Sequence, residues 1–314
     1  MVRESGSETS AESVVVLNPV SGDGTHVEPV REQSAVRGYG VSETESAGDT
    51  VSMTKTAIDA GATEILAAGG DGTVNGVVRG VVEADALDAV TVGVLPCGTG
   101  NDFAENVGIS DIGQGFDAIE TGERRRIDLG FADEAPFVNS CVGGLTAESS
   151  AETDPDMKDR FGSLAYVITT LKTIPSFDGI RMTVTLSDGP DEPSVWSGSA
   201  IAVLIGNARR FPPGGSTAAD VEDGRFDVTV VEGDGSVGLL ETGTVERLFT
   251  RESERTHRFT VPSLDIEVHA DEHAAFSLDG EVVERTALSV RARQQALEVA
   301  VGPGYEPTPD GTGD

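Results

Sequence analysis

Residues 65–73 read ILAAGGDGT, an apolar run that leads directly into a turn with three glycines and one acid. A short apolar run bounded by glycine predicts a buried strand. Because glycine has no Cβ, the backbone amides of such a turn can come within hydrogen-bonding distance of an anion. The next residues carry valine at helical spacing: Val74, Val77, Val78, Val81 and Val82. We therefore predict a strand, a turn and a helix whose positive N-terminus faces a phosphate group.

Asp71 is the unexpected residue in this turn, because a carboxylate repels a phosphate. The repulsion is relieved if a divalent cation or a substrate hydroxyl lies between the two groups, which favours phosphoryl transfer over simple binding. The alternative is an ordinary strand-to-helix turn with solvated polar side chains.

Two further predicted strands end in polar turns that contain glycine. Residues 14–17 (VVVL) lead into 18–22 (NPVSG), and residues 92–95 (VGVL) lead into 96–102 (PCGTGND). In an open parallel sheet the carboxyl ends of the strands line one crevice, so the three turns can converge on one ligand. This convergence favours a nucleotide phosphate site.

In this order and spacing, the three segments resemble the catalytic domain of the diacylglycerol kinase and sphingosine kinase superfamily, especially the bacterial-type soluble lipid kinases. The resemblance covers about residues 13–303. Its further segments are 127–130 (IDLG), 139–147, 160–166 (RFGSLAY), 206–207 with 214–215, 223–227 (DGRFD) and 279–281 (DGE).

The periodicity of the chain predicts two domains with a cleft. Up to about residue 130, strands alternate with helical patterns at 26–37, 49–60, 73–84 and 101–107, which is typical of a Rossmann-like α/β domain with a parallel sheet. From 131 to 287 the segments are short and β-like, which predicts a mostly antiparallel β-sandwich. The resemblance implies that this domain binds the lipid substrate. The resemblance implies that about residues 288–303 return to the first domain. Residues 1–12 and 304–314 are expected to be flexible tails.

One helix is expected within the second domain, where apolar residues recur between positions 161 and 174. This stripe is either part of the core or lines a slot for acyl or isoprenoid chains, and its spacing is compatible with both.

The charge of the chain is strongly negative, with 54 acids against 22 bases and a net charge of −32. Such self-repulsion destabilises a compact fold in dilute buffer, but at about 1 M salt the Debye length falls to about 3 Å. We interpret the chain as an enzyme of a halophile and do not expect it to bind nucleic acid. A disordered acidic chain is excluded by the recurring apolar periodicities.

A cytoplasmic location is expected, because no apolar stretch is long enough to span a membrane and the N-terminus does not resemble a signal peptide. The only two cysteines, Cys97 and Cys141, lack the spacing of metal ligands and are interpreted as packing residues.

The resemblance implies that ATP phosphates lie against the backbone amides of two turns, with polar contacts from the first. The residues concerned are Asn18, Ser21, Gly69, Gly70, Gly72, Thr73, Gly98, Thr99, Gly100 and Asn101. Many relatives carry a basic residue just after the first turn, whereas residues 23–26 here read DGTH. Mg²⁺, Arg31 or the arginines at 124–126 are the candidates for the missing positive charge.

The resemblance implies two candidates for the residue that deprotonates the acceptor hydroxyl, namely Asp71 and Glu281. We favour Glu281 as the base and Asp71 as the organiser of metal and phosphate, with Asp128 holding water or metal. The alternative for residues 279–281 is a plain hairpin turn. The resemblance also implies a structural Mg²⁺ site formed by Asp220, Glu222 and Asp223, although these acids can equally be surface charge.

These residues together lead us to expect an ATP- and Mg²⁺-dependent lipid kinase. Its acceptor would be the hydroxyl of diacylglycerol or an analogous lipid alcohol, reached transiently at the membrane surface. The sequence is compatible with a monomer and with a homodimer. The alternatives are an enzyme similar to NAD kinase, which shares the GGDGT turn, and a non-catalytic relative that binds nucleotide and has a regulatory role.

Overall fold

The computed structural model describes residues 12–46, 48–145, 179–189, 193–211, 218–233, 255–269 and 273–309. The chain divides into two compact units. Unit 1 comprises Met1–Ala104, Ile109–Arg125 and Glu298–Pro303. Unit 2 comprises Glu105–Gly108, Arg126–Leu297 and Gly304–Asp314.

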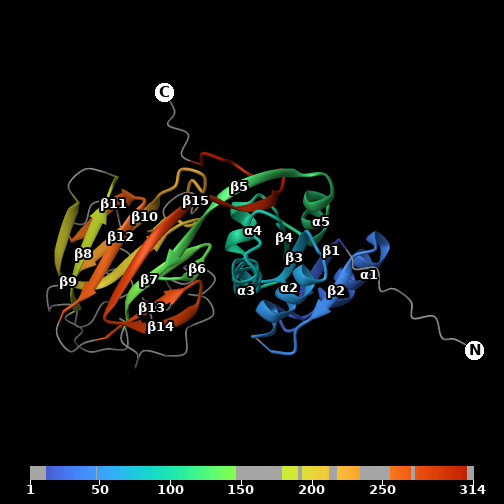
Figure 1. Cartoon of the computed structure of the whole chain (residues 1–314), viewed down its shortest axis with the longest axis horizontal. Helices are drawn as coiled ribbons and strands as arrows, with labels where there is room; N and C mark the ends of the chain where they lie inside the picture. Colours follow the sequence, from blue (N-terminus) through green and yellow to red (C-terminus); the bar gives the residue numbers. More distant parts are fainter. Residues whose placement is uncertain are drawn as a thin grey trace, which may run out of the picture. The chain divides into compact units, whose positions relative to one another are not determined.

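Unit 1 is built on a parallel sheet (Figure 1). Its strands are β1 (Ser13–Leu17), β2 (Gly40–Glu43), β3 (Glu64–Gly69) and β4 (Thr91–Pro96), in the spatial order β2-β1-β3-β4. The end of β15 (Ala287–Val301) extends this sheet by pairing in parallel with β4. Strands β1, β3 and β4 are almost entirely buried, which explains their unbroken apolar runs. The strands predicted at 14–17, 65–68 and 92–95 are thus confirmed.

Helices connect these strands, as the alternating pattern predicted. They are α1 (Val27–Arg37), α2 (Asp49–Asp59), α3 (Asp71–Glu83) and α4 (Asp102–Asn106), followed by α5 (Ile112–Thr121). The first four agree closely with the predicted helices, whereas α5 was not predicted because two glycines weaken its helical pattern. Its local signal is Asp111, whose carboxylate caps the helix by accepting a hydrogen bond from the amide of Gln114.

The strand order of unit 1 determines where a ligand can bind. The chain passes from β1 to β2 on one side, and β3 then lies on the other side of β1. This reversal makes a topological switch point between β1 and β3, and ligands of open α/β sheets bind outside the carboxyl ends of the strands at such a point.

Unit 2 is mostly antiparallel β-structure, which confirms the predicted change of fold class. Its strands, in chain order, are β5 (Glu123–Ala132), β6 (Ala135–Phe137), β7 (Ser140–Leu145), β8 (Ile180–Ser187), β9 (Ser194–Gly206), β10 (Phe226–Glu232), β11 (Thr256–Val261), β12 (Ser263–Val268), β13 (Ala274–Leu278), β14 (Glu281–Arg285) and most of β15. β5 begins in unit 1, and β15 ends there.

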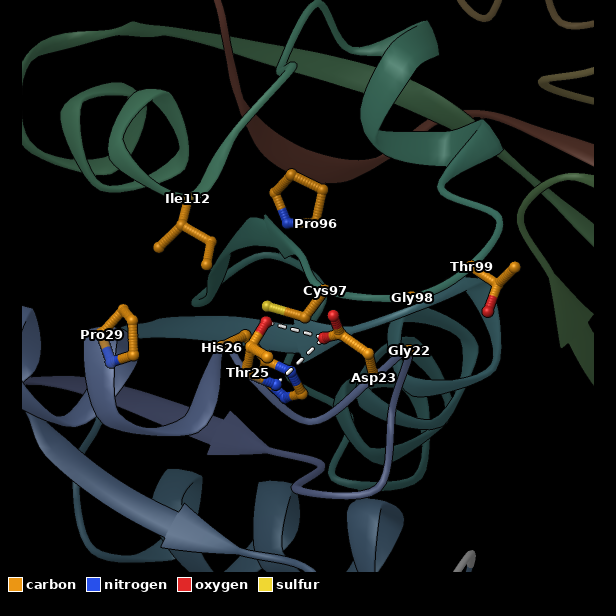
Figure 2. A pocket seen from close by; sticks show the side chains of 10 residues that line it. All are labelled: Gly22, Asp23, Thr25, His26, Pro29, Pro96, Cys97, Gly98, Thr99 and Ile112. Atoms are coloured by element: carbon orange, nitrogen blue, oxygen red, sulfur yellow. Dashed lines mark hydrogen bonds between the residues drawn. The ribbon is translucent and has the colours of Figure 1, made fainter.

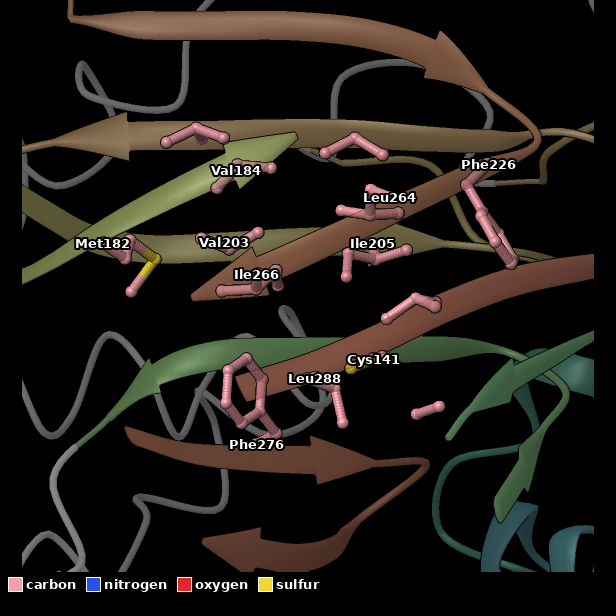
Figure 3. Packing of buried hydrophobic residues seen from close by; sticks show 14 of the residues in the cluster. Cys141, Met182, Val184, Val203, Ile205, Phe226, Leu264, Ile266, Phe276 and Leu288 are labelled. Atoms are coloured by element: carbon pink, nitrogen blue, oxygen red, sulfur yellow. The ribbon is translucent and has the colours of Figure 1, made fainter. Parts of the chain in front are cut away.

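The core of unit 2 is formed by alternating side chains of these strands (Figure 3). Met182 and Val184 of β8, Ile266 of β12 and Phe276 of β13 are all buried within it. The period of two along each strand places one set of side chains in this core and the other outside it.

Apart from the short segment Glu105–Gly108 and the residues from Gly304 onward, which belong to unit 2, the chain passes between the units after Arg125 and after Leu297. The expected boundaries were 130 and 288. Residues 304–309, expected as part of a flexible tail, are described and make contacts within unit 2. The hydroxyl of Tyr305 donates a hydrogen bond to Glu222 Oε1 over 2.7 Å. The helix expected at 161–174 lies outside the described residues. No helix in the described part of the chain is long and apolar enough to cross a membrane.

Candidate functional site

The three glycine-containing turns of unit 1 lie together at the carboxyl ends of β1, β3 and β4. The amide of Asn18, directly after β1, donates to the carbonyl of Ala68 over 2.9 Å. The Asn18 side chain then donates from Nδ2 to Thr73 Oγ1 in the second turn, over 3.3 Å. The amide of Cys97, directly after β4, donates to the carbonyl of Gly69 over 3.0 Å. The predicted convergence of the turns is therefore confirmed.

Close backbone contacts explain why glycine occupies these turns. A Cβ atom on Gly98 would lie 2.4 Å from the Cα of Gly70, and a Cβ on Gly22 would lie 2.7 Å from the carbonyl oxygen of Cys97. Gly22 also has a φ of 55°, in the left-handed region. The first turn therefore packs on the third, and the third packs on the second.

The third turn is closed by the side chain of Asn101. Its Oδ1 accepts a hydrogen bond from the amide of Gly98 over 2.9 Å, and its Nδ2 donates to the carbonyl of Gly98 over 3.0 Å. Thr99 and Gly100, inside this closed turn, are exposed, as is Gly72 in the first turn of α3. A Cβ on Gly72 would meet no atom within 4 Å, so the backbone there borders open space. An anion can therefore approach the start of α3.

The carboxylate of Asp71 joins the second and third turns. Its Oδ1 accepts a hydrogen bond from the amide of Phe103 over 2.9 Å, and its Oδ2 accepts one from the amide of Asp102 over 3.2 Å. These two amides partly offset the negative charge of the carboxylate. The role of Asp71 as organiser of metal and phosphate stays a prediction.

A pocket of about 620 Å³ lies beside these turns (Figure 2). Its apolar lining comes from Pro29, Pro96 and Ile112, and its polar lining includes Asp23 and His26. It also includes Gly22, Cys97, Gly98 and Thr99, so it borders the first and third turns. The pocket is thus continuous with the residues expected to contact phosphate.

Asp23 opens the segment 23–26, where the resemblance led us to expect a basic residue. Hydrogen bonds from the hydroxyl and the amide of Thr25, over 2.7 and 3.0 Å, hold the pKa of Asp23 below its ordinary value. The first turn therefore carries a negative charge at neutral pH, and a phosphate bound nearby would need a cation to accompany it.

Asp128 of β5 is fully buried in unit 2. Its Oδ1 accepts a hydrogen bond from the amide of Gln295 over 2.7 Å, and its Oδ2 accepts one from the amide of Gly224. Burial raises the pKa of Asp128 to about 6, with Asp223 and Asp220 adding to the rise and the two amides opposing it. The side chain therefore links three segments of unit 2, and its predicted role in holding water or metal stays a prediction.

The three acids expected to bind a structural Mg²⁺ are each engaged with other groups. Asp220 accepts a hydrogen bond from the amide of Glu222, Glu222 accepts one from Tyr305, and Asp223 accepts one from the amide of Arg225. Within the described ranges, no group of three or more His, Cys, Asp or Glu side chains is arranged to hold a metal ion. The magnesium site at Asp220, Glu222 and Asp223 stays a prediction.

Glu281 begins β14 and is exposed. It pairs with Leu278 across a tight turn in which Asp279 and Gly280 have φ values of 48° and 99°. Two positive φ values at an Asp-Gly pair are typical of a type I′ hairpin, so residues 279–281 do form the hairpin turn that we considered as the alternative. The catalytic role of Glu281 stays a prediction. Asp71 belongs to unit 1, whereas Glu281, Asp128 and the acids at 220–223 belong to unit 2.

Asp279 is a residue that sequence reasoning did not single out as part of the site. Its carboxylate accepts hydrogen bonds from three consecutive amides, those of Val138, Asn139 and Ser140, over 2.6, 3.0 and 2.8 Å. Its own amide donates to the carbonyl of Ser140. The hairpin that carries Glu281 is thereby fixed to the segment between β6 and β7.

The side-chain amide of Asn207 donates to a backbone carbonyl of the segment between β6 and β7 and to one of β5. Its Nδ2 donates to the carbonyl of Val138 over 2.8 Å and to the carbonyl of Asp128 over 3.0 Å. A continuous set of hydrogen bonds therefore runs within unit 2 from the Asp279 hairpin to Asp128. The sequence signal was the Gly206-Asn207 pair of the resemblance, which carried no assigned role.

Comparison with known proteins agrees with this arrangement. Residues 12–132 match the family model described as the diacylglycerol kinase catalytic domain. Residues 139–301 match that of the YegS C-terminal NAD kinase beta sandwich-like domain. The chain is 31% identical over 281 residues to a "Probable lipid kinase YegS-like" of Pseudomonas aeruginosa (strain UCBPP-PA14), covering 87% of this chain and 88% of that protein.

A further relative and a solved structure cover most of the chain. A diacylglycerol kinase of Bacillus subtilis (strain 168) is 29% identical over 280 residues, which cover 85% of this chain and 88% of the relative. The crystal structure of a diacylglycerol kinase from Bacillus anthracis str. Sterne matches with a TM-score of 0.71 at 21% identity and covers 95% of this chain and 99% of that one. The structural match supports the fold.

Proposed function

Because the chain belongs to the bacterial family of YegS-like lipid kinases and diacylglycerol kinases, we propose that it transfers the γ-phosphate of ATP to a lipid hydroxyl. The proposed acceptor is diacylglycerol or an analogous lipid alcohol, reached transiently at the membrane surface from the cytoplasm.

The observation that carries the proposal is the meeting of three glycine-containing turns at the switch point of a parallel sheet. The turn between β3 and α3 offers backbone amides and the positive end of a 13-residue helix to an anion. Gly72, Thr99 and Gly100 are exposed at this place, so phosphate oxygens can reach the backbone. In phosphoryl transfer such fixed donors stabilise the charge on the equatorial oxygens of the transferred group.

Bound Mg²⁺ would neutralise part of the phosphate charge. Magnesium in kinases is held by one or two carboxylates together with substrate phosphates, so a protein cage of three acids is not required. Asp71 lies in the second of the three glycine-containing turns, and we assign it to hold the ion. The negative charge of Asp23 in the first turn agrees with a nucleotide that binds together with a cation.

We assign the role of general base to Glu281. As the acceptor oxygen forms its bond to the γ-phosphorus, the bond from that phosphorus to the β-phosphate oxygen breaks and ADP leaves. The acceptor proton passes late in this process to the Glu281 carboxylate, so an ordinary carboxylate basicity is sufficient. Asp279, through its three amide contacts, would hold the hairpin that presents this carboxylate.

The test is phosphate transfer from ATP labelled with radioactive phosphorus in the γ position. The protein is incubated at high salt with Mg²⁺ and an extracted lipid pool, and the labelled product is identified. Label in a lipid monophosphate supports the proposal. Parallel incubations contain NAD in place of lipid, and a reaction with the Asp71→Asn variant is the control. Label that appears in NAD but not in lipid, or in neither, would contradict the proposal.

A further inference from the structure

The turn after β1, residues 18–24, contains no lysine or arginine. Gly22 and Gly24 have positive φ values of 55° and 75°, and Val20 at the tip is 85% exposed. An exposed turn with two such glycines loses much conformational entropy when it becomes ordered. The contacts that hold this turn in place therefore bear directly on how well it can contact a nucleotide.

His26 makes one of these contacts. Its side chain is buried, and its Nε2 lies 3.0 Å from the carbonyl oxygen of Asn18 at the start of the turn. Although His26 is the N-cap residue of α1, its side chain does not cap the helix. A carbonyl oxygen only accepts hydrogen bonds, so Nε2 must carry the proton. The imidazolium and one neutral tautomer both satisfy this requirement.

Asn18 is engaged at every polar group, which determines the orientation of its side-chain amide. Its backbone amide donates to Ala68, and its Oδ1 accepts from the amide of Val20 over 3.2 Å. Its carbonyl accepts from His26 and from the amide of Ser21. The remaining group, Nδ2, donates to Thr73 Oγ1. His26 is therefore connected through Asn18 alone to the second glycine-containing turn, residues 69–73.

We propose that His26 is a positioning residue for nucleotide binding. Its ring holds the carbonyl of Asn18, which keeps the Asn18 amide against Thr73 and keeps the first turn joined to the second. His26 acts through Asn18 and not on the phosphate itself. The inference deepens the proposed function, on which it rests, by naming the residue that holds the first turn ready for ATP.

The experiment measures ATP binding and lipid phosphorylation at high salt for the full chain and three variants. His26→Ala removes the donor, His26→Gln restores an amide donor, and Val36→Ala alters a residue of the same helix that is 86% exposed. His26→Ala should weaken ATP binding about tenfold, the factor expected for one lost hydrogen bond, and raise the KM for ATP by a similar factor. kcat at saturating ATP and the KM for lipid should stay within about threefold of wild type, because the chemical groups are unchanged.

A rescue variant and a double-mutant cycle distinguish a positioning role of His26 from a general loss of structure. His26→Gln should restore ATP binding to within about threefold of wild type, since its amide nitrogen can donate to Asn18, and Val36→Ala should bind like wild type. In a double-mutant cycle, the effect of His26→Phe on ATP binding should be smaller when Thr73→Val is already present, because both variants break one chain of contacts. His26→Phe keeps a ring without a donor and serves if the alanine variant does not fold.

Three results would overturn the proposal. They are equal ATP binding by His26→Ala and wild type, failure of His26→Gln to restore binding, and additive effects of His26→Phe and Thr73→Val. A wild-type chain that does not bind ATP would instead contradict the proposed function, so the two failures are distinguishable.

Discussion

Asp71 accepts a hydrogen bond from the amide of Phe103 over 2.9 Å and so joins the glycine turn after β3 to the start of α4. The same carboxylate is the acid that we assign to hold magnesium. One side chain would thus carry a structural task and a catalytic one. This double role makes Asp71 the most informative position for substitution.

Asp71→Asn keeps the shape of the side chain but removes its charge and one of its two acceptor oxygens. We expect lipid phosphorylation to fall by at least about a hundredfold while ATP still binds. We also expect the free energy of unfolding to fall by about 1–2 kcal/mol, because one hydrogen bond to a charged acceptor is lost. Turnover assays and denaturant titration measure the two effects. Wild-type turnover in this variant would mean that the turn is only structural.

Gly98→Ala tests the close packing of the second and third turns. The added Cβ would lie 2.4 Å from the Cα of Gly70, which is a backbone atom and not the end of a flexible side chain. We expect a loss of about 1–3 kcal/mol of folding stability together with weaker ATP binding. Gly48→Ala is the matched control, because a Cβ there meets nothing within 4 Å. Equal unfolding free energies for the two variants would show that the turns can separate without cost.

Glu281→Gln should lower the rate of lipid phosphorylation by about a hundredfold or more, while ATP affinity stays within a few-fold of wild type. Its stability should not change, because Glu281 is exposed on β14. Asp279→Asn provides the contrast, since it weakens three amide contacts and should lower the unfolding free energy. If Glu281→Gln instead weakens ATP or Mg²⁺ binding and leaves turnover intact, Asp71 becomes the preferred base.

Asp128 predicts a pH dependence of stability. Burial raises the pKa of this carboxyl to about 6 in the folded protein, above its unfolded value of about 4. Between these two pKa values the folded state binds more protons than the unfolded state. The contribution of Asp128 to the free energy of unfolding therefore falls as the pH rises. Wild type should therefore lose stability relative to Asp128→Asn from about pH 4 to pH 6, by up to about 2–3 kcal/mol, and then level off. Denaturant titrations of both proteins across this range measure the difference, and an increase with pH would contradict the raised pKa.

The net charge of −32 predicts a strong dependence on salt. Screening of self-repulsion should raise the melting temperature steeply between about 0.1 and 2 M KCl. Calorimetry across this range tests the interpretation of the chain as a halophile's enzyme. A melting temperature that stays constant would refute it.

Much of unit 1 could be predicted from sequence because its signals are local. Apolar runs such as residues 14–17 and 65–68 are long enough to mark buried strands, and the valines from Val74 onward mark a helical face. The glycine turns follow directly on the strands, so a parallel sheet brings them to one edge. α5 was missed because its two glycines obscure the helical pattern, although Asp111 caps it.

Only the tertiary structure decided which backbone groups the carboxylates of unit 2 contact. Asp279 accepts from Val138, 141 positions earlier, and Asp128 accepts from Gln295, 167 positions later. Residue types and spacing identified the strands and the glycine turns, because strand and turn formation depend on neighbouring residues. They also nominated the candidate acids, whose roles stay predictions. The hydrogen-bond donors of a carboxylate come from whichever backbone amides the fold brings within about 3 Å, and that distance is unrelated to separation along the chain.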